Sequence, residues 1–389
     1  MGERWSLMKK FLIGVVVFLL VISSPTFVAA QKAKEIRIGG IFPMTGGSAT
    51  FGKSSKEGMQ IAVDEFNNKG GIAIAGSKLL IKAIYDDTAG QPLQAVNVCR
   101  KQIDQDRVVA IVGEVMSKNS LAIAPICQSK GIVMISPAST NPQVTQKGDY
   151  IFRVCFLDSF QGIVMARYVY DNLKLKKAAI LYDNANDYNK GLASFFAEEF
   201  KRLGGQIVSS EAFTDEEKTV DFKAQLTTIK ANKPEFLYLP NYYAASALIT
   251  KQARELGLNV PAGGGDGWDS PRLAEIGGKD VEGGVFSNHF SKDDPSPKVQ
   301  GFVKKYRGKY NSDPDALASL AYDAAFILLS AIEKAGSLKG ADIRDALKTM
   351  KFDGVTGKIS FDQNRNPVKS AVILQIKNGK QQYIVTVSP

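Results

Sequence analysis

Short apolar runs alternate with amphipathic stretches along the first half of the chain. The apolar runs lie at 35–42, 79–85, 108–112, 132–135 and 150–154. Between them, apolar residues recur at helical spacing, as Ile61 and Phe66 do in the stretch 53–69. An alternation of this kind predicts βα units that form a doubly wound parallel sheet.

The alternation starts again after residue 177 and predicts a second lobe of similar size. Its expected strands lie at 178–182, 206–213, 236–239 and 259–263, with helical stretches between them. No low-complexity linker separates the two series, which indicates several crossings between the lobes. The tail after residue 357 predicts antiparallel strands that turn at 364–367 and at Asn378-Gly379. The predicted fold class is α/β, with two doubly wound parallel-sheet lobes.

The beginning of the chain has the three parts of a secretory signal peptide in order. Arg4, Lys9 and Lys10 precede the apolar run 11–22, and small residues follow it at 28–30. The apolar run is too short for a comfortable membrane span. We therefore expect residues 1–30 to be a signal peptide that is cleaved after Ala30, and the mature protein to be exported.

Charge and histidine content exclude some classes of function. The formal net charge is +10, but Lys and Arg are scattered among Asp and Glu, so a nucleic-acid partner is not expected. His289 is the only histidine and has no partner at ligand spacing in the sequence. A zinc site or a hydrolase triad would both require it. We therefore expect no metal, no cofactor and no enzymatic activity.

The three cysteines leave two possibilities open. Cys99 and Cys127 fall on predicted helices of neighbouring βα units, and Cys155 follows a predicted strand. Helices of neighbouring right-handed units can share one face of the sheet. A disulfide between Cys99 and Cys127 and a set of buried free thiols are both compatible with the sequence.

Hydroxyl residues collect where two adjacent strands of the first lobe end. Ser117 follows the run 108–112, and Ser139 and Thr140 follow the run 132–135. A buried strand that leads into a helix presents free backbone N–H groups and hydroxyls, which suit a small anion such as a carboxylate. Each cluster alone is also compatible with ordinary capping and turn residues.

The second lobe supplies the opposite charge at its strand ends. Asp266 follows the expected strand 259–263 in a glycine-rich turn and suits a cation. The apolar and aromatic residues expected between the two walls are Phe51, Met116, Tyr242 and Trp268. Donors that face a carboxylate across an apolar gap are what an α-amino acid zwitterion requires, because burying either charge is costly without a partner.

Eight motifs spread over the mature chain occur in the same order as in one known family. They are IRIGGIFPMTG, FGKSSKEGMQIAVDEFN, YDDT, IVGEVMS, ISPASTNP, FRVCFLDSFQG, YLPNYY and GGDGWDSP. With these motifs the chain resembles the periplasmic substrate-binding proteins of branched-chain amino acid ABC transporters, the leucine/isoleucine/valine-binding family. The resemblance covers nearly the whole mature chain.

The resemblance implies a type I periplasmic binding protein clamshell, in which a three-crossing hinge joins two lobes that close on the ligand. It implies an N-terminal lobe of residues 34–155 and 288–351 and a C-terminal lobe of residues 156–287 and 352–389. The ligand-binding residues that it implies are Phe51, Ser117, Ala138, Ser139, Thr140, Tyr242 and Asp266.

Two positions depart from the family pattern. Asp266 stands where well-known leucine binders have the longer Glu, and Met116 stands where they have a Cys. The partner of that Cys is also missing near Thr88, so the small disulfide of the family is expected to be absent.

The leading interpretation is a monomeric periplasmic solute-binding protein that captures an amino acid, branched-chain or otherwise apolar, and delivers it to a membrane ABC permease. A second interpretation keeps the fold and takes an amide, urea or an aromatic carboxylate as the ligand. An exported hydrolase is a third interpretation, which one isolated histidine supports poorly.

The expected cleavage site can be tested by the mass of the exported protein. We expect the mature chain to begin at Gln31, and Ala30→Phe to leave unprocessed precursor because the site requires small residues. Ala33→Phe, beyond the site, is the control and should be processed normally. A mature protein that retains residues 1–30 would contradict the assignment.

Overall fold

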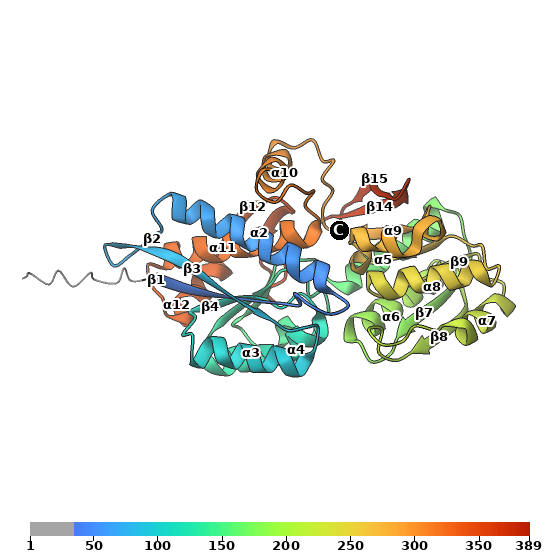
Figure 1. Ribbon diagram of the computed structural model, residues 1–389, viewed down its shortest axis with the longest axis horizontal. Coiled ribbons are helices and arrows are strands. Elements are labelled where there is room, and N and C mark those ends of the chain that lie inside the picture. Colours follow the sequence, from blue (N-terminus) through green and yellow to red (C-terminus); the bar gives the residue numbers. More distant parts are fainter. Residues whose placement is uncertain (1–34) are drawn as a thin grey trace, which may run out of the picture. The chain divides into compact units, whose positions relative to one another are not determined.

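The computed structural model describes residues 35–389. The expected signal peptide at 1–30 lies outside these residues. The described chain gathers around two large sheets, and segments that are distant in the sequence come together in each of them (Figure 1).

The first lobe contains a six-stranded sheet with the order β2-β3-β1-β4-β5-β6. Neighbouring strands are parallel, except that β2 and β3 form an antiparallel hairpin. The strands are β1 (Glu35–Phe42), β2 (Ile72–Ile74), β3 (Ser77–Asp87), β4 (Ala110–Gly113), β5 (Val133–Ser136) and β6 (Ile151–Arg153). This order places the carboxyl ends of β1, β4 and β5 side by side, which is where such sheets bind ligands.

Helices cover both faces of this sheet. The helices of the lobe are α2 (Ala49–Asn68), α3 (Pro92–Asp104), α4 (Ser117–Lys130), α10 (Pro297–Tyr310), α11 (Ala316–Ala335) and α12 (Gly340–Lys348). Ile41 and Ile111 pack with α3 and α4, whereas Ile38 and Val112 belong to the core that contains α2 and α11. Both faces of each strand are therefore buried, which explains why the strands are apolar throughout.

Helix α11 returns to the first lobe from far along the chain and lies against α2 (Figure 1). Its length and composition alone would allow it to cross a membrane, but 83% of its apolar window is buried inside the protein. The two helices approach closely at Gly58, where a Cβ would lie 1.9 Å from the carbonyl oxygen of Ala318. Helix α11 is therefore a core helix whose packing depends on a glycine in α2.

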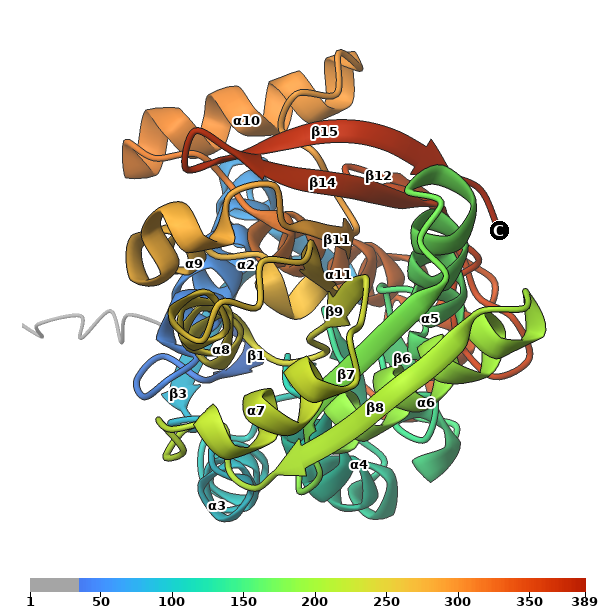
Figure 2. The ribbon, with the colours of Figure 1, turned by 90° about the vertical axis from the view of Figure 1, so that its right-hand side faces the viewer.

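The second lobe contains a seven-stranded sheet with the order β15-β14-β11-β10-β9-β7-β8 (Figure 2). The strands are β7 (Lys177–Asp183), β8 (Gln206–Phe213), β9 (Phe236–Tyr238), β10 (Ala262–Gly264), β11 (Val285–Asn288), β14 (Ala371–Lys377) and β15 (Lys380–Val387). The strands from β8 to β11 are parallel, and β14 and β15 are antiparallel. Asn378 and Gly379 form the predicted turn, with φ angles of 53° and 68°.

The helices of the second lobe follow its strands in the expected alternation. They are α5 (Asp158–Arg167), α6 (Asp187–Arg202), α7 (Lys223–Ala231), α8 (Tyr243–Glu255) and α9 (Pro271–Gly277). Short 3-10 turns at Thr145–Lys147, Asp266–Trp268 and Gly278–Val281 and a π-helical turn at Tyr168–Asn172 complete the described elements.

The chain passes between the lobes after β6, after β11 and before β14. A buried hydrogen bond joins the first and third of these crossing segments. Lys369 of the third segment is 4% exposed and donates to the carbonyl of Val154 in the first segment at 3.0 Å. Burial lowers the pKa of Lys369 to about 8, and Asp323 opposes this effect. Ring stacking of Phe156 on His289 joins the first and second segments, so the three crossings form one hinge region.

The predicted lobe boundary at 352 falls within a short hairpin that precedes β14. The intervening hairpin of β12 (Lys351–Gly354) and β13 (Gly357–Ser360) packs on the first lobe. Phe352 stacks on Phe326 of α11 with ring centroids 5.3 Å apart, and Asp323 of α11 accepts from the N–H of Val355 at 2.8 Å. The hairpin therefore contacts α11 of the first lobe through a partly buried aromatic residue.

The cysteines occur as buried free thiols. The Sγ atoms of Cys99 and Cys127 are 3.7 Å apart on the neighbouring helices α3 and α4. A disulfide bond would bring these atoms to about 2.05 Å. Of the two possibilities that the sequence leaves open, the structure has the thiols.

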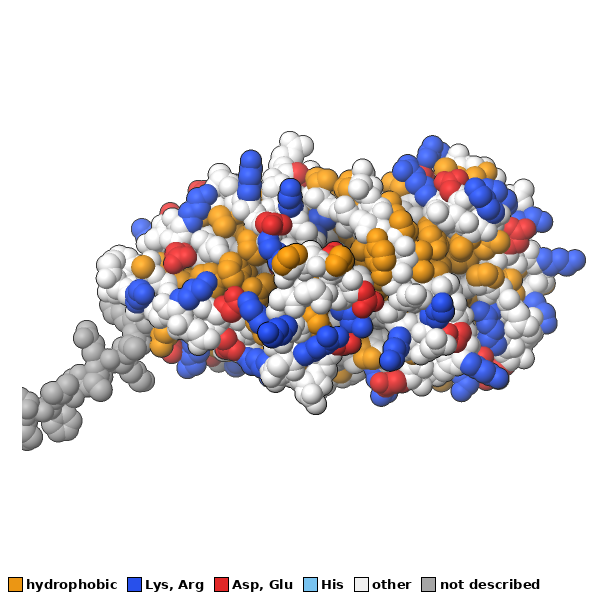
Figure 3. All heavy atoms as spheres, turned by 90° about the horizontal axis from the view of Figure 1, so that it is seen from above, with side chains coloured by type: hydrophobic (Ala, Val, Ile, Leu, Met, Phe, Trp, Pro, Cys, Tyr) orange, Lys and Arg blue, Asp and Glu red, His pale blue; other side chains and the backbone are white. Residues whose placement is uncertain are grey.

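Charged residues on the surface are interspersed rather than grouped. On the face in Figure 3, Lys and Arg side chains lie among Asp and Glu side chains. Many of them form pairs, as Lys101 does with Asp86 at 2.9 Å and with Asp106 at 3.0 Å. This arrangement agrees with a solvated basic surface.

We expect Gly58→Ala to destabilise the protein by roughly 1–3 kcal/mol, because the new methyl group must push α2 away from α11. Chemical denaturation of the variant and the wild type measures the difference. Gly301→Ala in α10 is the matched control, since no atom lies within 4 Å of its Cβ position. The control should be neutral or stabilising by up to about 1 kcal/mol. Equal stability of the two variants would show that α2 and α11 are not in close contact.

Candidate functional site

A small cavity lies where the carboxyl ends of the strands of the two lobes meet. Its lining residues are Phe51, Val115, Ser117, Ala138 and Leu317 from the first lobe, and Tyr188, Tyr242, Asp266 and Gly267 from the second. Five of the nine predicted site residues therefore meet here: Phe51, Ser117, Ala138, Tyr242 and Asp266.

The first-lobe wall of the cavity presents hydrogen-bond donors at the start of α4. Ser117 is the first residue of this helix and is 2% exposed. Its Oγ accepts from the backbone N–H of Asn141 at 3.2 Å, and within residues 35–389 no acceptor takes its hydroxyl proton. The first N–H groups of a helix also lack intrahelical partners and carry partial positive charge. This wall therefore suits a carboxylate.

A buried carboxyl group lies behind this wall and holds the turn from β4 into α4. Oε1 of Glu114 accepts from Thr88 Oγ1 at 2.7 Å and from Asn119 Nδ2 at 3.1 Å. Oε2 accepts from the backbone N–H of Met116 at 2.5 Å. Burial raises the pKa of Glu114 to about 7, although these donors act in the opposite direction.

Two predicted site residues support the wall from behind instead of lining the cavity. Ser139 Oγ donates to the backbone carbonyl of Glu114 at 2.9 Å and lies 2.7 Å from Ser120 Oγ. Met116 is 1% exposed, and its sulfur lies 3.9 Å from Nδ2 of Asn119. Both side chains therefore order the hydroxyl-rich turns rather than face the open space.

Thr140 is also buried behind the cavity, where it contacts the first crossing segment. Its carbonyl accepts from the backbone N–H of Asp158 at 3.0 Å. Burial raises the pKa of the Asp158 carboxyl to about 7, and the Thr140 hydroxyl opposes this effect. Thr140 thus joins the end of β5 to the start of α5.

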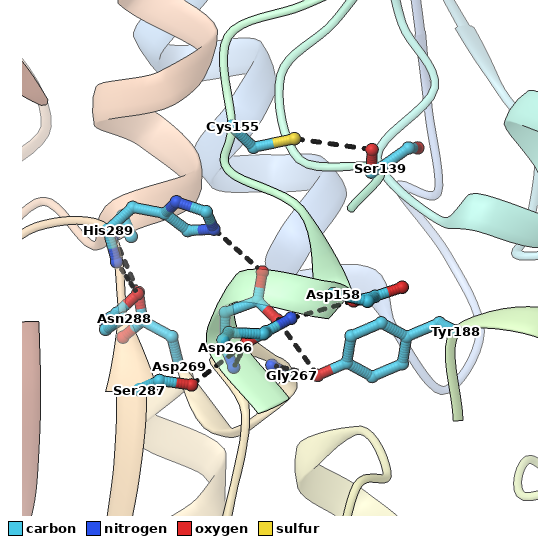
Figure 4. Close-up of polar contacts among 12 residues, drawn as sticks. Ser139, Cys155, Asp158, Tyr188, Asp266, Gly267, Asp269, Ser287, Asn288 and His289 are labelled. Atoms are coloured by element: carbon cyan, nitrogen blue, oxygen red, sulfur yellow. Dashed lines mark hydrogen bonds and ion pairs between the residues drawn. The ribbon is translucent and has the colours of Figure 1, made fainter. Parts of the chain in front are cut away.

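The second-lobe wall carries a carboxylate that is held by three partners (Figure 4). Asp266 is 8% exposed, and its Oδ1 accepts from Gln161 Nε2 and Tyr188 Oη, both at 3.0 Å. Its Oδ2 lies 2.9 Å from His289 Nε2. Because a carboxylate has about four acceptor positions, one position on Oδ2 remains for a donor in the cavity. Gln161 and Tyr188 are uncharged, and burial lowers the pKa of His289, so within residues 35–389 the negative charge of Asp266 has no cationic partner at neutral pH.

Tyr188 is a site residue that the sequence reasoning did not single out. Its hydroxyl also accepts from the backbone N–H of Gly267 at 3.0 Å, and its ring stacks on Tyr242 with centroids 5.2 Å apart. The segment 183–188 follows β7 in the way that the other site segments follow their strands. That shared position was the signal that could have identified it.

Apolar groups from both lobes close the remaining sides of the cavity. Phe51 contacts Tyr242 across the lobes, with ring centroids 5.7 Å apart and an interplanar angle of 84°. The backbone N–H of Tyr242 donates to Glu216 Oε2 at 2.8 Å, and burial raises the pKa of Glu216 to about 7. Leu317 comes from α11, which follows another helix, so no strand-end signal pointed to it.

The structure places Trp268 in the core of the second lobe rather than in the cavity wall. Its side chain is fully buried, and Nε1 donates to the carbonyl of Leu239 at 3.0 Å. Because it lies two residues after Asp266 in the same 3-10 turn, this contact anchors the turn that carries the carboxylate.

His289 has a partner that its neighbours in the sequence do not reveal. Asp266 and His289 follow β10 and β11, which are adjacent parallel strands, so the sheet brings their side chains together. The ring of His289 also stacks on Phe156 with centroids 3.5 Å apart. No motif in the sequence marks the contact of His289 with Asp266, because this contact depends on the order of strands in the sheet.

Polar contacts join the two lobes beside the cavity. Glu217 of the second lobe accepts from Gln91 Nε2 at 2.9 Å and lies 3.8 Å from Lys118 Nζ. The hydroxyls of Thr50 and Ser270 lie 3.0 Å apart. The lobes therefore contact each other around a small internal space. In residues 35–389 no group of three or more His, Cys, Asp or Glu side chains could hold a metal ion.

Comparisons with known proteins agree on one family. The family described as periplasmic binding protein matches residues 35–381. The Leu/Ile/Val-binding protein BraC3 of Rhizobium johnstonii is 34% identical over 332 residues, which cover 85% of this chain and 88% of that protein. The crystal structure of the leucine-binding protein LivK from Thermotoga maritima has 40% identity and a TM-score of 0.85, and the match covers 91% of this chain and 99% of that one. The substrate-binding protein LivJ from Streptococcus pneumoniae, crystallised with isoleucine, has 35% identity and a TM-score of 0.85, with 92% and 100% coverage.

We expect the ionisation of Glu114 to lower the free energy of unfolding as pH rises from about 5 to about 7. The pKa of Glu114 is raised from 4.5 to about 7 in the folded protein, so the folded state binds more protons than the unfolded state in this window. Glu114→Gln cannot ionise and should make the slope of stability against pH less negative. Denaturant titrations at pH 5.5 and 7.5 measure the slope. Asp345→Asn, at a carboxylate that is 58% exposed, is the control. A Glu114→Gln slope equal to that of the wild type would contradict the assignment.

Proposed function

Because the chain belongs to the periplasmic binding protein family, we propose that it captures a small α-amino acid with an apolar side chain, branched-chain or similar, between its two lobes. The family and the relatives described above are solute-binding proteins and not enzymes. The fold is the two-lobed clamshell of these proteins. The proposal concerns which solute is bound and which residues hold it.

The observation that carries this proposal is the pair of opposed, incompletely satisfied walls. Asp266 is a buried carboxylate without a cationic partner and with a free acceptor position toward the cavity. Ser117 and the first turn of α4 offer free donors on the other side. A zwitterion would satisfy both walls, since its ammonium would donate to Asp266 and its carboxylate would accept from the Ser117 wall.

The remaining surface of the cavity supports an apolar ligand side chain. Phe51, Tyr242 and Leu317 present aromatic and aliphatic groups, and Val115 and Ala138 add small apolar ones. Each CH₂ group that the ligand buries contributes about 0.8 kcal/mol. The names of the relatives, which refer to leucine, isoleucine and valine, point in the same direction.

Ligand contacts with both lobes would stabilise the closed arrangement, because the open form has only one wall available. We further propose that the protein is exported to the periplasm through its N-terminal segment, acts as a monomer and delivers its ligand to an ABC permease. LivJ, with which the chain shares 35% identity, is described as the substrate-binding protein of a branched-chain amino acid transporter.

We expect Asp266→Asn to weaken binding of leucine, isoleucine or valine by about a hundred-fold or more, because the ligand's ammonium loses the only charged partner in the cavity wall. Isothermal calorimetry at pH 7.5 on ligand-free protein measures the change. Asp345→Asn is the control, since its side chain is exposed and remote from the cavity.

The same titrations separate the proposed function from its alternative. Urea, a short amide or an aromatic carboxylate has no ammonium group, so a protein adapted to such a ligand should keep most of its affinity in Asp266→Asn. If no α-amino acid binds more tightly than about 1 mM while one of these compounds does, the zwitterion assignment fails.

We expect Ser117→Ala to weaken binding of leucine by roughly ten-fold, because a hydrogen bond to the ligand's carboxylate is lost. Leucinamide, which lacks that negative charge, should bind the wild type weakly and should respond little to Ser117→Ala. Calorimetry with both ligands gives the comparison. An equal loss for leucine and leucinamide would indicate that Ser117 does not face the carboxylate.

A further inference from the structure

His289 is held in place from three directions. Its Nε2 lies 2.9 Å from Oδ2 of Asp266 (Figure 4). Its ring stacks on Phe156 at a centroid distance of 3.5 Å. Its backbone follows β11 at the start of the second crossing segment, and Phe156 belongs to the first crossing segment. The side chain therefore connects the first and second crossing segments to the carboxylate of Asp266 in the cavity wall.

The contact with Asp266 determines which nitrogen carries the proton. An ionised carboxylate can only accept hydrogen bonds, so Nε2 must donate. Nδ1 is buried and has no hydrogen-bond partner within residues 35–389, which leaves its lone pair as the place where an additional proton would bind. The neutral Nε2–H tautomer is thus the form that fits the geometry.

Charged groups surround His289 on both sides. Asp266 favours the imidazolium, whereas the buried Lys369 disfavours it. Lys358 and Asp294 line the same pocket as His289 and Lys369. Asp158 lies further away and is connected to Asp266 through Gln161 Nε2, which donates to both carboxyl groups at 2.9 and 3.0 Å.

We propose that His289 is a positioning residue that orients Asp266 for the ligand's ammonium group and makes ligand capture dependent on pH. This inference rests on the proposed function, since it assumes that the ligand is a cationic amine at this position. The neutral imidazole fixes Oδ2 and leaves the charge of Asp266 available. The imidazolium would neutralise that charge and would repel the ammonium, so protonation of His289 opposes binding.

The direction of the pH dependence follows from the surroundings of the ring. Burial lowers the pKa of His289 below its ordinary value of 6.5, and Asp266 opposes this effect. An ammonium group on Asp266 would lower this pKa further by like-charge repulsion. Affinity should therefore be constant above about pH 6.5 and should fall as the solution becomes more acidic, because the ligand must then displace a proton from His289.

Because His289 is the only histidine in the chain, its state can be observed directly. Histidine-selective ¹⁵N NMR of the untagged mature protein gives the tautomer without any resonance assignment. We expect the Nε2–H tautomer at pH 7.5 and a shift of its signals in Asp266→Asn. An Nδ1–H tautomer, or signals that do not respond to Asp266→Asn, would overturn the proposal.

Ligand affinity between pH 5.0 and 7.5 tests the functional part with two variants. His289→Gln keeps an N–H donor but cannot ionise, so it should bind leucine within about five-fold of the wild type at pH 7.5 and should show less pH dependence. His289→Leu removes the donor and should bind on the order of ten-fold more weakly at all pH values. The wild type should bind leucine less tightly at pH 5.0 than at pH 7.5.

Groups such as Glu114, Glu216 and Asp158 also titrate in this range, but they do so in the wild type and in His289→Gln alike. Identical pH profiles for these two proteins would therefore overturn the proposed role of His289. If no amino acid binds at any pH, the proposed function fails, and the NMR experiment still decides whether His289 holds Asp266.

Discussion

The charge of Asp266, buried without a cationic partner, is the constraint on which the arrangement of the cavity depends. Ionised carboxylates are expensive to remove from water unless hydrogen bonds and an opposite charge replace the solvent. The protein supplies the hydrogen bonds through Gln161, Tyr188 and His289, but none of these contributes a permanent positive charge. Within residues 35–389, the negative charge of Asp266 is therefore not balanced by a positive charge on the side that faces the cavity. That imbalance explains why an amine is the kind of ligand that the structure favours.

The two walls that would contact the charges of the proposed ligand belong to different lobes, and this links ligand binding to closure of the lobes. Donors of the Ser117 wall belong to the first lobe, and Asp266 belongs to the second. A ligand with only one of the two charges would pair with one wall. On closure, the polar groups of the other wall would lose their water without gaining a partner. A zwitterion of the proposed kind would pair with both walls, and it could do so only when the lobes are closed. Its binding would therefore stabilise the closed form.

The turns that carry the cavity residues are held by other buried carboxyl groups. Glu114 accepts from a backbone N–H behind the Ser117 wall, and Glu216 accepts from the N–H of Tyr242. Burial raises the pKa of both groups to about 7, so at neutral pH the interior combines protonated and ionised carboxyls. These groups fix short loops at strand ends, where the regular hydrogen bonding of the sheet has already stopped. Hydrogen bonds thus hold the turns on each side of the cavity.

The sequence alone determined the local elements and the family. Apolar runs and helical spacing are local properties, so the strands of both lobes, the turn at Asn378-Gly379 and the residues after the strands could be predicted before the structure was known. Five of the predicted site residues meet in the cavity because the carboxyl ends of parallel strands share one edge of a sheet.

The tertiary structure decided what depends on the order of strands and on burial. Trp268 and Met116 carry no local signal that distinguishes a core side chain from a cavity wall, and only packing places both of them inside. The β12–β13 hairpin contacts α11 through Phe352, and no pattern in the sequence marks this contact. His289 gained its role from the pairing of β10 with β11, since that pairing brings together two residues that are 23 positions apart. Contacts of this kind arise between elements, and a sequence pattern records only what happens within them.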